Sequence, residues 1–302
     1  MLRFALTVTT ALVLGACSRG HDPGAVTKGD TAAKSPSGAV DRGPTTIPLD
    51  GDPNGLWWDV ATNALLVADS GNNRILKWTD GGGVAKIADL PAAPQKNPGL
   101  GQLVKTADGR IFVTRFGSGT AGDVVYVSAD GTTGTVPGLD PHRRRIGLTV
   151  TAQGTLYDAY FVKDAGQTLG AVARLDPAGT ETDVATGMGK PVGVLASGAD
   201  LFASDQEAGA LLKVPLVGSS KATVVTQVPA TDLLCSGPDG SLFTGGTAGE
   251  IRRIGRDGVV STFARGFTSV RGVAYDAKNK RLFASEHDTH GKANALRIVP
   301  VN

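Results

Sequence analysis

Residues 54–70, NGLWWDVATNALLVADS, decide the fold of this chain. They read as an apolar strand that starts beside a glycine, a short polar turn and a second apolar strand, a pattern typical of a β-hairpin. The pattern recurs five more times. The copies are LGQLVKTADGRIFVTRF (100–116), IGLTVTAQGTLYDAYF (146–161), VGVLASGADLFASDQ (192–206), DLLCSGPDGSLFTGG (232–246) and RGVAYDAKNKRLFASEH (271–287).

The spacing of the copies indicates the architecture. The equivalent positions Gly55, Gly101, Gly147, Gly193, Leu233 and Gly272 are separated by 46, 46, 46, 40 and 39 residues. A period of this length, with alternating strands and Asp-Gly turns such as Asp80-Gly81, is typical of the four-stranded blades of a β-propeller. No stretch shows a sustained helical period, so we predict an all-β chain that forms a six-bladed β-propeller.

The composition excludes several classes of protein. Glycine makes up 42 of 302 residues but has no period of three, so it does not indicate collagen. A hydrophobic fraction of 41% and a net charge of +2 exclude bulk disorder. The small net charge also argues against nucleic acid as a partner, because nucleic-acid binders carry a clustered basic excess.

The two ends of the repeat region complement each other. The last copy stops after a third strand at 295–301, while a β-prone segment at 45–49 precedes the first copy. Pairing these segments completes the last blade and removes an exposed sheet edge. We therefore predict that an N-terminal strand closes the ring, that residues 45–302 form one propeller domain, and that the protein is a monomer.

The N-terminus is typical of an export signal. One arginine precedes an apolar run at 4–14, which suits a signal peptide but is too short to span a bilayer. The run ends in Leu14-Gly15-Ala16-Cys17, which resembles the lipobox of bacterial lipoproteins. The resemblance implies a signal peptide at 1–16, lipidation of Cys17, and a protein anchored to a membrane of the bacterial cell envelope, either in the outer membrane or facing the periplasm. The segment that follows is rich in Gly, Pro, Ser, Thr and Ala without apolar periodicity, so residues 17–44 are predicted to be a flexible tether. The alternatives are an ordinary secretory signal cleaved nearby and a chance cysteine.

The first copy carries a signature of its own. The segment Val67-Ala68-Asp69-Ser70-Gly71-Asn72-Asn73-Arg74-Ile75 resembles the NHL-repeat signature, and the sixfold pattern is similar to the wider NHL, gluconolactonase and streptogramin-lyase group of propellers. In NHL repeats the aspartate, here Asp69, mostly stabilises its own blade together with Asn73 and Arg74. The resemblance implies the fold and leaves activity open, since these propellers include both enzymes and pure binders.

One face of such a ring is expected to carry the function. The loops from second to third strand and the crossovers between blades share this face, and here they are the longer loops. They include 116–122, 161–169 and 287–293, and the histidines of the domain, His142, His287 and His290, lie on the same face. Because propeller ligands usually bind at the channel mouth of a loop-rich face, we expect a small-molecule or protein ligand there.

Polar residues aligned at this mouth form the candidate site. Oxygen donors from the last two blades and the first suit a divalent cation such as Ca²⁺, and a histidine beside them suits a general base. The alignment predicts metal ligation by Asn54, Asp232 and Glu286, catalysis by His287 and Glu286, and ligand binding by Arg115, Arg145, Arg271 and Tyr160.

Alternative interpretations stay open. Arg271 and Glu286 can be an ion pair that fills the channel, and the stretch from Glu286 to His290 can be a polar loop without a site. The gluconolactonase resemblance implies a divalent metal held by Glu, Asn and Asp from different blades. Here Asn54 stands where that pattern expects Glu, and the aligned residues of the next three blades, which cannot coordinate, are Leu100, Ile146 and Val192.

The sequence thus predicts a cell-envelope lipoprotein propeller that binds a small ligand at its loop-rich channel mouth. Metal-assisted, gluconolactonase-like hydrolysis of a lactone or ester is the activity that the resemblance implies. The alternative is a non-catalytic envelope scaffold or protein-interaction propeller, so the question of enzyme or binder is open.

Overall fold

The computed structural model describes residues 45–302 apart from 96, 218–220, 289–293 and 302. The chain divides into two compact units, residues 1–41 and 42–302, and all described residues belong to the second. The expected signal peptide, the tether and Cys17 therefore lie outside the described residues, as does His290. No helix in the described part is long and apolar enough to cross a membrane.

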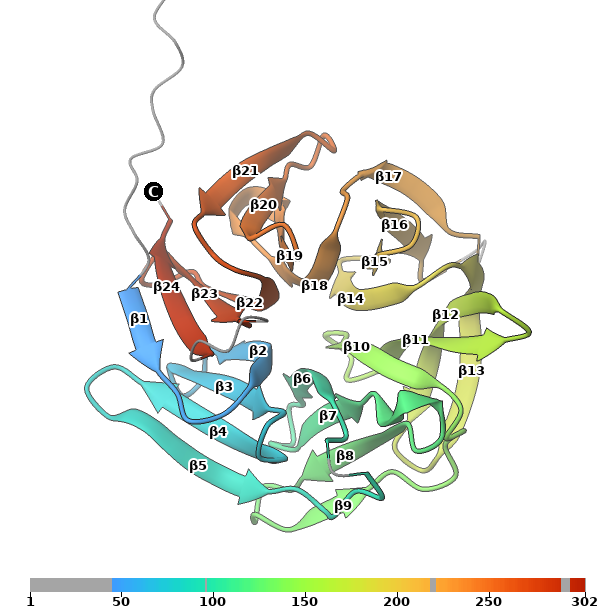
Figure 1. Cartoon of the computed structure of the whole chain (residues 1–302), viewed down its shortest axis with the longest axis horizontal. Coiled ribbons are helices and arrows are strands. Elements are labelled where there is room, and N and C mark those ends of the chain that lie inside the picture. The colour runs from blue at the N-terminus through green and yellow to red at the C-terminus, as the bar shows by residue number, and fades with distance from the viewer. Residues whose placement is uncertain (1–44, 96, 218–220, 289–293, 302) are drawn as a thin grey trace, which may run out of the picture. The chain divides into compact units, whose positions relative to one another are not determined.

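Four of the sheets have four strands each, which follow one another in chain order from the ring axis outward (Figure 1). They are β2–β5 (Pro53–Asp59, Ala64–Asp69, Arg74–Thr79, Gly83–Asp89), β6–β9 (Leu100–Lys105, Ile111–Arg115, Asp123–Val127, Thr133–Thr135), β10–β13 (Arg144–Val150, Leu156–Asp164, Gln167–Asp176, Thr180–Met188) and β14–β17 (Pro191–Ser197, Asp200–Asp205, Ala210–Pro215, Thr223–Gln227). The described residues include no α-helix, only two single turns of 3-10 helix, η1 (Gly117–Gly119) and η2 (Pro238–Gly240).

The fifth sheet has eight strands. It contains β18–β21 (Thr231–Ser236, Leu242–Gly246, Glu250–Ile254, Val260–Arg265), β22–β24 (Val270–Asp276, Arg281–Glu286, Ala295–Pro300) and β1 (Thr45–Pro48). One residue pair, Gly246 with Val270, joins β19 to β22. The sheets therefore differ from the six separate blades expected, because glycines let the two backbones meet here: a Cβ on Gly245 would lie 2.4 Å from the Val270 carbonyl oxygen.

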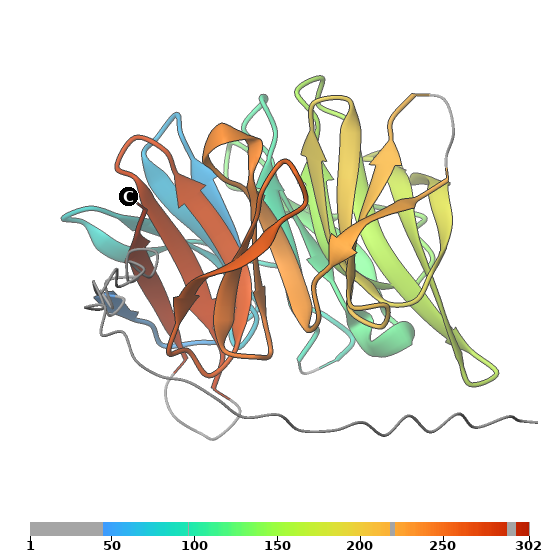
Figure 2. The ribbon, with the colours of Figure 1, turned by 90° about the horizontal axis from the view of Figure 1, so that it is seen from above.

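The first strand of each repeat lies closest to the ring axis (Figure 1), and the edge-on view shows the strands running between the two faces (Figure 2). The recurring glycines lie where these inner strands approach one another. A Cβ on Gly55 would lie 2.3 Å from the Gly101 carbonyl oxygen, and one on Gly272 would lie 2.1 Å from that of Asn54. A side chain cannot fit at such distances, so the glycine spacing in the sequence reports the packing of neighbouring inner strands.

The predicted closing strand is confirmed. β1 pairs antiparallel with β24, with Thr45 opposite Ile298 and Pro48 opposite Ala295. Ile47 and Leu49 are partly buried against the core cluster of the first and last repeats, which includes Trp58, Trp78 and Phe283. The N-terminal segment of the domain therefore covers the edge that β24 would otherwise expose.

Candidate functional site

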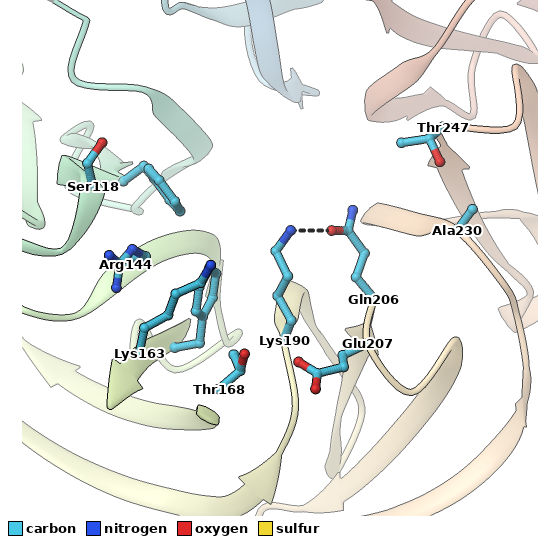
Figure 3. Close-up of a pocket in the computed structure, with 11 residues that line it drawn as sticks. Ser118, Arg144, Lys163, Thr168, Lys190, Gln206, Glu207, Ala230 and Thr247 are labelled. Carbon is cyan, nitrogen blue, oxygen red and sulfur yellow. Dashed lines mark hydrogen bonds between the residues drawn. The ribbon is translucent and has the colours of Figure 1, made fainter. Parts of the chain in front are cut away.

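A cavity of about 710 Å³ opens on the loop-rich face of the ring (Figure 3). Its walls come from the ends of β10, β11 and β12, from the loops that follow β7, β15 and β19, and from the crossovers that enter β14 and β18. The lining side chains include Phe116, Arg144, Phe161, Lys163, Lys190 and Glu207. The cavity therefore lies on the expected face, but over the second to fifth repeats and not over the fifth, sixth and first.

Positive charge dominates the cavity wall. Among the described residues, Arg144, Lys163 and Lys190 line it together with a single carboxylate, that of Glu207. Lys190 extends between the two sides of the cavity and its Nζ donates to the Gln206 Oε1 at 2.8 Å (Figure 3). Its cationic group also lies 5.7 Å from the centre of the Phe161 ring, a favourable cation–π distance.

The loop at η1 fixes the position of Arg144. Gly117 and Gly119 both have positive φ values, 57° and 87°, which turn the chain back toward the crossover before β10. A Cβ on Gly119 would lie 2.5 Å from the Arg144 Cζ, so the guanidinium packs directly against the glycine backbone. The sequence alone did not single out Arg144 among the three adjacent arginines.

Arg145 and Tyr160, both predicted ligand-binding residues, belong to a buried network and do not line the cavity. The Arg145 guanidinium is fully buried and forms ion pairs with Asp158 and Glu181. The Tyr160 hydroxyl donates to Asp183 at 2.8 Å, and burial raises the pKa of this phenol. These contacts give both side chains a role in packing the third repeat.

Arg115 is also placed differently from the prediction. Its side chain is 1% exposed, and its Nη2 donates to the Asn73 Oδ1 at 3.2 Å and to the Pro91 carbonyl. Burial lowers the pKa of this guanidinium, although Asp123 at 3.4 Å opposes the effect. Arg115 thus ties the first repeat to the second.

Carboxylates at the end of the second strand of several repeats accept hydrogen bonds from the backbone of the segment that leads into the same repeat. Asp69 accepts from the Asp52 N–H and from Arg74, as the NHL resemblance implied, and Asp205 accepts from the N–H groups of Gly189 and Lys190. Glu286 accepts from the Thr268 N–H at 2.8 Å and pairs with Arg297 at 3.2 Å. The common position of these carboxylates in the repeat was visible in the sequence, and it indicates a structural role that Glu286 shares.

Asp52, directly before β2, joins several polar side chains, although the sequence pattern did not indicate it. Its carboxylate accepts from Arg271 at 3.3 Å and contacts the His287 Nδ1 at 2.9 Å. The Asn294 side-chain amide donates to the same group at 3.2 Å. Arg271 and His287 are therefore brought together through Asp52, and within the described residues neither forms an ion pair or hydrogen bond with Glu286.

Asp232 lies at the start of the inner strand β18. Burial raises its pKa to about 7, and the positive charges of Arg271 and Lys190 partly oppose that effect. Asn54 begins the equivalent part of β2 and donates its side-chain amide to the Leu100 carbonyl at 2.6 Å. Of the three predicted metal ligands, Glu286 does not fit a metal set because an N–H donor and an arginine engage its two oxygens. Across the described residues, no three His, Cys, Asp or Glu side chains lie close enough together to hold a metal ion.

The raised pKa of Asp232 makes stability depend on pH. In the unfolded chain this carboxyl ionises near pH 4, whereas in the folded protein it holds its proton to about pH 7. Folding stability from this group is therefore highest below pH 4 and falls as the pH rises to 7. We expect the free energy of unfolding of Asp232→Asn, relative to that of the wild type, to increase by about 1–3 kcal/mol as the pH rises from 4 to 8. This range allows for partial solvent screening. Urea unfolding of both proteins at the two pH values measures this gain, and an unchanged difference between them contradicts it.

Comparison with known proteins gives similarity in structure only. No protein-family model matches this sequence, and no curated protein matches it significantly. Among solved structures, a gluconolactonase of Xanthomonas campestris aligns with a TM-score of 0.68 at 18% identity over 85% of this chain and 89% of its own. The virginiamycin B lyase of Staphylococcus aureus aligns with a TM-score of 0.61 at 12% identity over 85% and 99% of the two chains. A chain of a nidogen–laminin complex aligns with a TM-score of 0.60 at 13% identity over 74% and 85%.

The chain has an all-β propeller fold. Its neighbours include propellers of the gluconolactonase and virginiamycin B lyase kind, in agreement with the resemblance at the level of the fold. At identities this low, the activity of this propeller has to be argued from its own cavity and charges.

Proposed function

We propose that this propeller binds a small molecule in the cavity over its second to fifth repeats. The observation that carries the proposal is the cavity itself, which lies on the face of the long loops and has room for a ligand of ordinary metabolite size. Aromatic side chains, cations and hydroxyl groups line it together, as is typical of sites that recognise both the shape and the polar groups of a ligand.

Ligand-observed NMR with a mixed set of neutral, anionic and cationic fragments tests this proposal. We expect hits for the wild type that are lost in Ala230→Trp, because Ala230 lines the cavity and an indole would fill it. Ala196→Trp is the matched control, since Ala196 lines a separate pocket at the other end of the inner strands. A fragment set without hits, or hits that survive Ala230→Trp, would favour the non-catalytic scaffold instead.

A gluconolactonase-like hydrolysis is the second candidate, and the environment of Asp232 favours it. A carboxyl with a pKa of about 7 can accept a proton from an attacking water at neutral pH. Lys190 lies both on the cavity wall and near enough to Asp232 to influence its charge. Lactone and ester hydrolysis that rises with pH through about 7 and is lost in Asp232→Asn would support this activity, and an unchanged rate in that variant would reject it.

Calcium at the mouth stays a proposal for Asp232 and Asn54, without Glu286 as a ligand. The support is the pair of oxygen-bearing side chains at the starts of β18 and β2, and we derive no catalytic step through a metal. Calcium at 100 times its dissociation constant would add about 2.7 kcal/mol of stability. Thermal melting with and without Ca²⁺ measures this, and Asp232→Ala would abolish the shift.

We infer that the eight-stranded sheet acts as two blades, which makes six in all, because β18–β21 are consecutive and one pair joins them to β22. Slow exchange of the amides within each half, with fast exchange at Gly246, would support this inference.

We also propose that lipid on Cys17 anchors the protein in the cell envelope, on the strength of the Leu14–Cys17 motif. Mass spectrometry of the mature N-terminus decides this, since an unmodified N-terminus elsewhere would reject the anchor.

A further inference from the structure

The charges of the cavity restrict the chemistry of its ligand. Most arginines in the described chain have an acidic partner, for example Arg74 with Asp69 at 2.6 Å and Arg281 with Asp276 at 2.8 Å. Arg144, Lys163 and Lys190 all line the cavity, and none of the three forms an ion pair with an acidic side chain in the described part. Three cations therefore converge on one hollow without the pairing found elsewhere in the molecule.

The single carboxylate of the wall does not balance this charge. Glu207 lines the same cavity but forms no ion pair with any of the three within the described residues. The described lining residues carry three positive charges and one negative charge, a net charge of +2. Like charges that gather around one cavity repel one another, and an anion bound among them would relieve that repulsion.

We propose that the ligand of this cavity is a small dianion whose two negative charges face Arg144, Lys163 and Lys190. The inference rests on the proposed ligand-binding function and adds the class of ligand. Two carboxylates or one phosphate monoester supply this charge, and an apolar part of the ligand would face the half-buried Phe116 ring. Gln206 positions Lys190 for this contact through the hydrogen bond to its Nζ.

A charge series at constant shape tests the proposal. Isophthalate, its monoamide and its diamide carry two, one and no negative charges on the same ring. We expect the dissociation constant, measured by calorimetry at low salt, to rise about tenfold with each charge removed, since a charge-assisted hydrogen bond is worth about that much. Added NaCl should weaken isophthalate binding and leave the diamide unchanged. Phenyl phosphate, compared with isophthalate, shows whether the site prefers a phosphate or two carboxylates.

Variants connect the charge preference to this wall. Lys163→Gln and Arg144→Gln are each expected to weaken isophthalate binding about tenfold, with little effect on the diamide. Lys77→Gln is the matched control, since Lys77 is an exposed lysine of β4 and does not belong to the lining residues.

Equal binding of the three compounds, or equal losses for all three in Lys163→Gln, overturns the proposal of a dianionic ligand and leaves a neutral ligand for the same cavity. If none of the probes binds while fragments that are lost in Ala230→Trp do bind, the dianion is also rejected. If those fragments do not bind either, the proposed ligand-binding function is rejected together with the dianionic ligand.

Discussion

Arg145→Ala is expected to lower the free energy of unfolding by about 3–5 kcal/mol, the range for removing one partner of a buried ion pair. The guanidinium is fully buried, and its loss leaves Asp158, also fully buried, without the partner that offsets its desolvation. Burial already raises the pKa of Asp158, and Arg145 is the main group that opposes this rise. Urea unfolding at pH 7 measures the loss.

Arg144→Ala is the control for this prediction, because Arg144 adjoins Arg145 but lines the open cavity and has no acidic partner among the described residues. We expect its effect on stability to be within about 0.5 kcal/mol. The double variant Arg145→Met with Asp158→Leu should recover part of the loss, since an apolar pair of similar volume can replace a buried ion pair. The recovery is partial because Glu181, the other carboxylate that pairs with Arg145, keeps only Arg143 at 3.3 Å within the described part of the chain. Similar losses for Arg144→Ala and Arg145→Ala would show that the buried network contributes no more than the surface residue.

Removing β1 is expected to lower the free energy of unfolding by about 3–5 kcal/mol. The comparison is between a chain that starts at residue 51 and one that starts at residue 45. The shorter chain loses four paired residues on β24 and the partly buried side chains of Ile47 and Leu49. It also exposes the backbone groups of β24 as an edge. For a domain of this size the loss corresponds to a fall of roughly 10 °C in Tm.

Thermal melting of the two chains decides between closure and a passive terminal segment. Ile47→Ser in the longer chain should give an intermediate Tm, because it removes apolar contact but keeps the strand pairing. Equal Tm values for the chains starting at 45 and 51 would mean that β1 does not stabilise the ring.

The repeat pattern made much of the fold predictable because its signals are local. Alternating apolar residues place the strands, and the spacing of Gly55, Gly101 and Gly147 reports contacts between neighbouring inner strands. The unpaired third strand at the end of the last copy required a partner, which β1 supplies. The joining of β19 to β22 was not predictable, since it depends on one pair of backbones from different repeats meeting at Gly246.

The site was less predictable, because the mouth-facing starts of the inner strands are irregular. Register shifts interrupt β10 between Arg145 and Gly147, β18 between Thr231 and Leu234, and β22 between Val270 and Val273. Each shift changes the side to which the neighbouring side chains turn, so aligning the repeats does not give their directions. Asp232 and Arg271 lie within two of these irregular stretches.

The sequence by itself determined that the chain is a ring of β-strand repeats, since hydrophobic alternation, turns and glycine spacing act within or between neighbouring repeats. It also located the loop-rich face, where the cavity lies. Only the tertiary structure decided which of two adjacent arginines is a packing residue and which faces the cavity. Arg145 is buried against Asp158, whereas Arg144 packs on Gly119 and lines the hollow. The physical reason is that successive side chains of a strand point to opposite sides, and a backbone irregularity beside them sets which side faces the cavity.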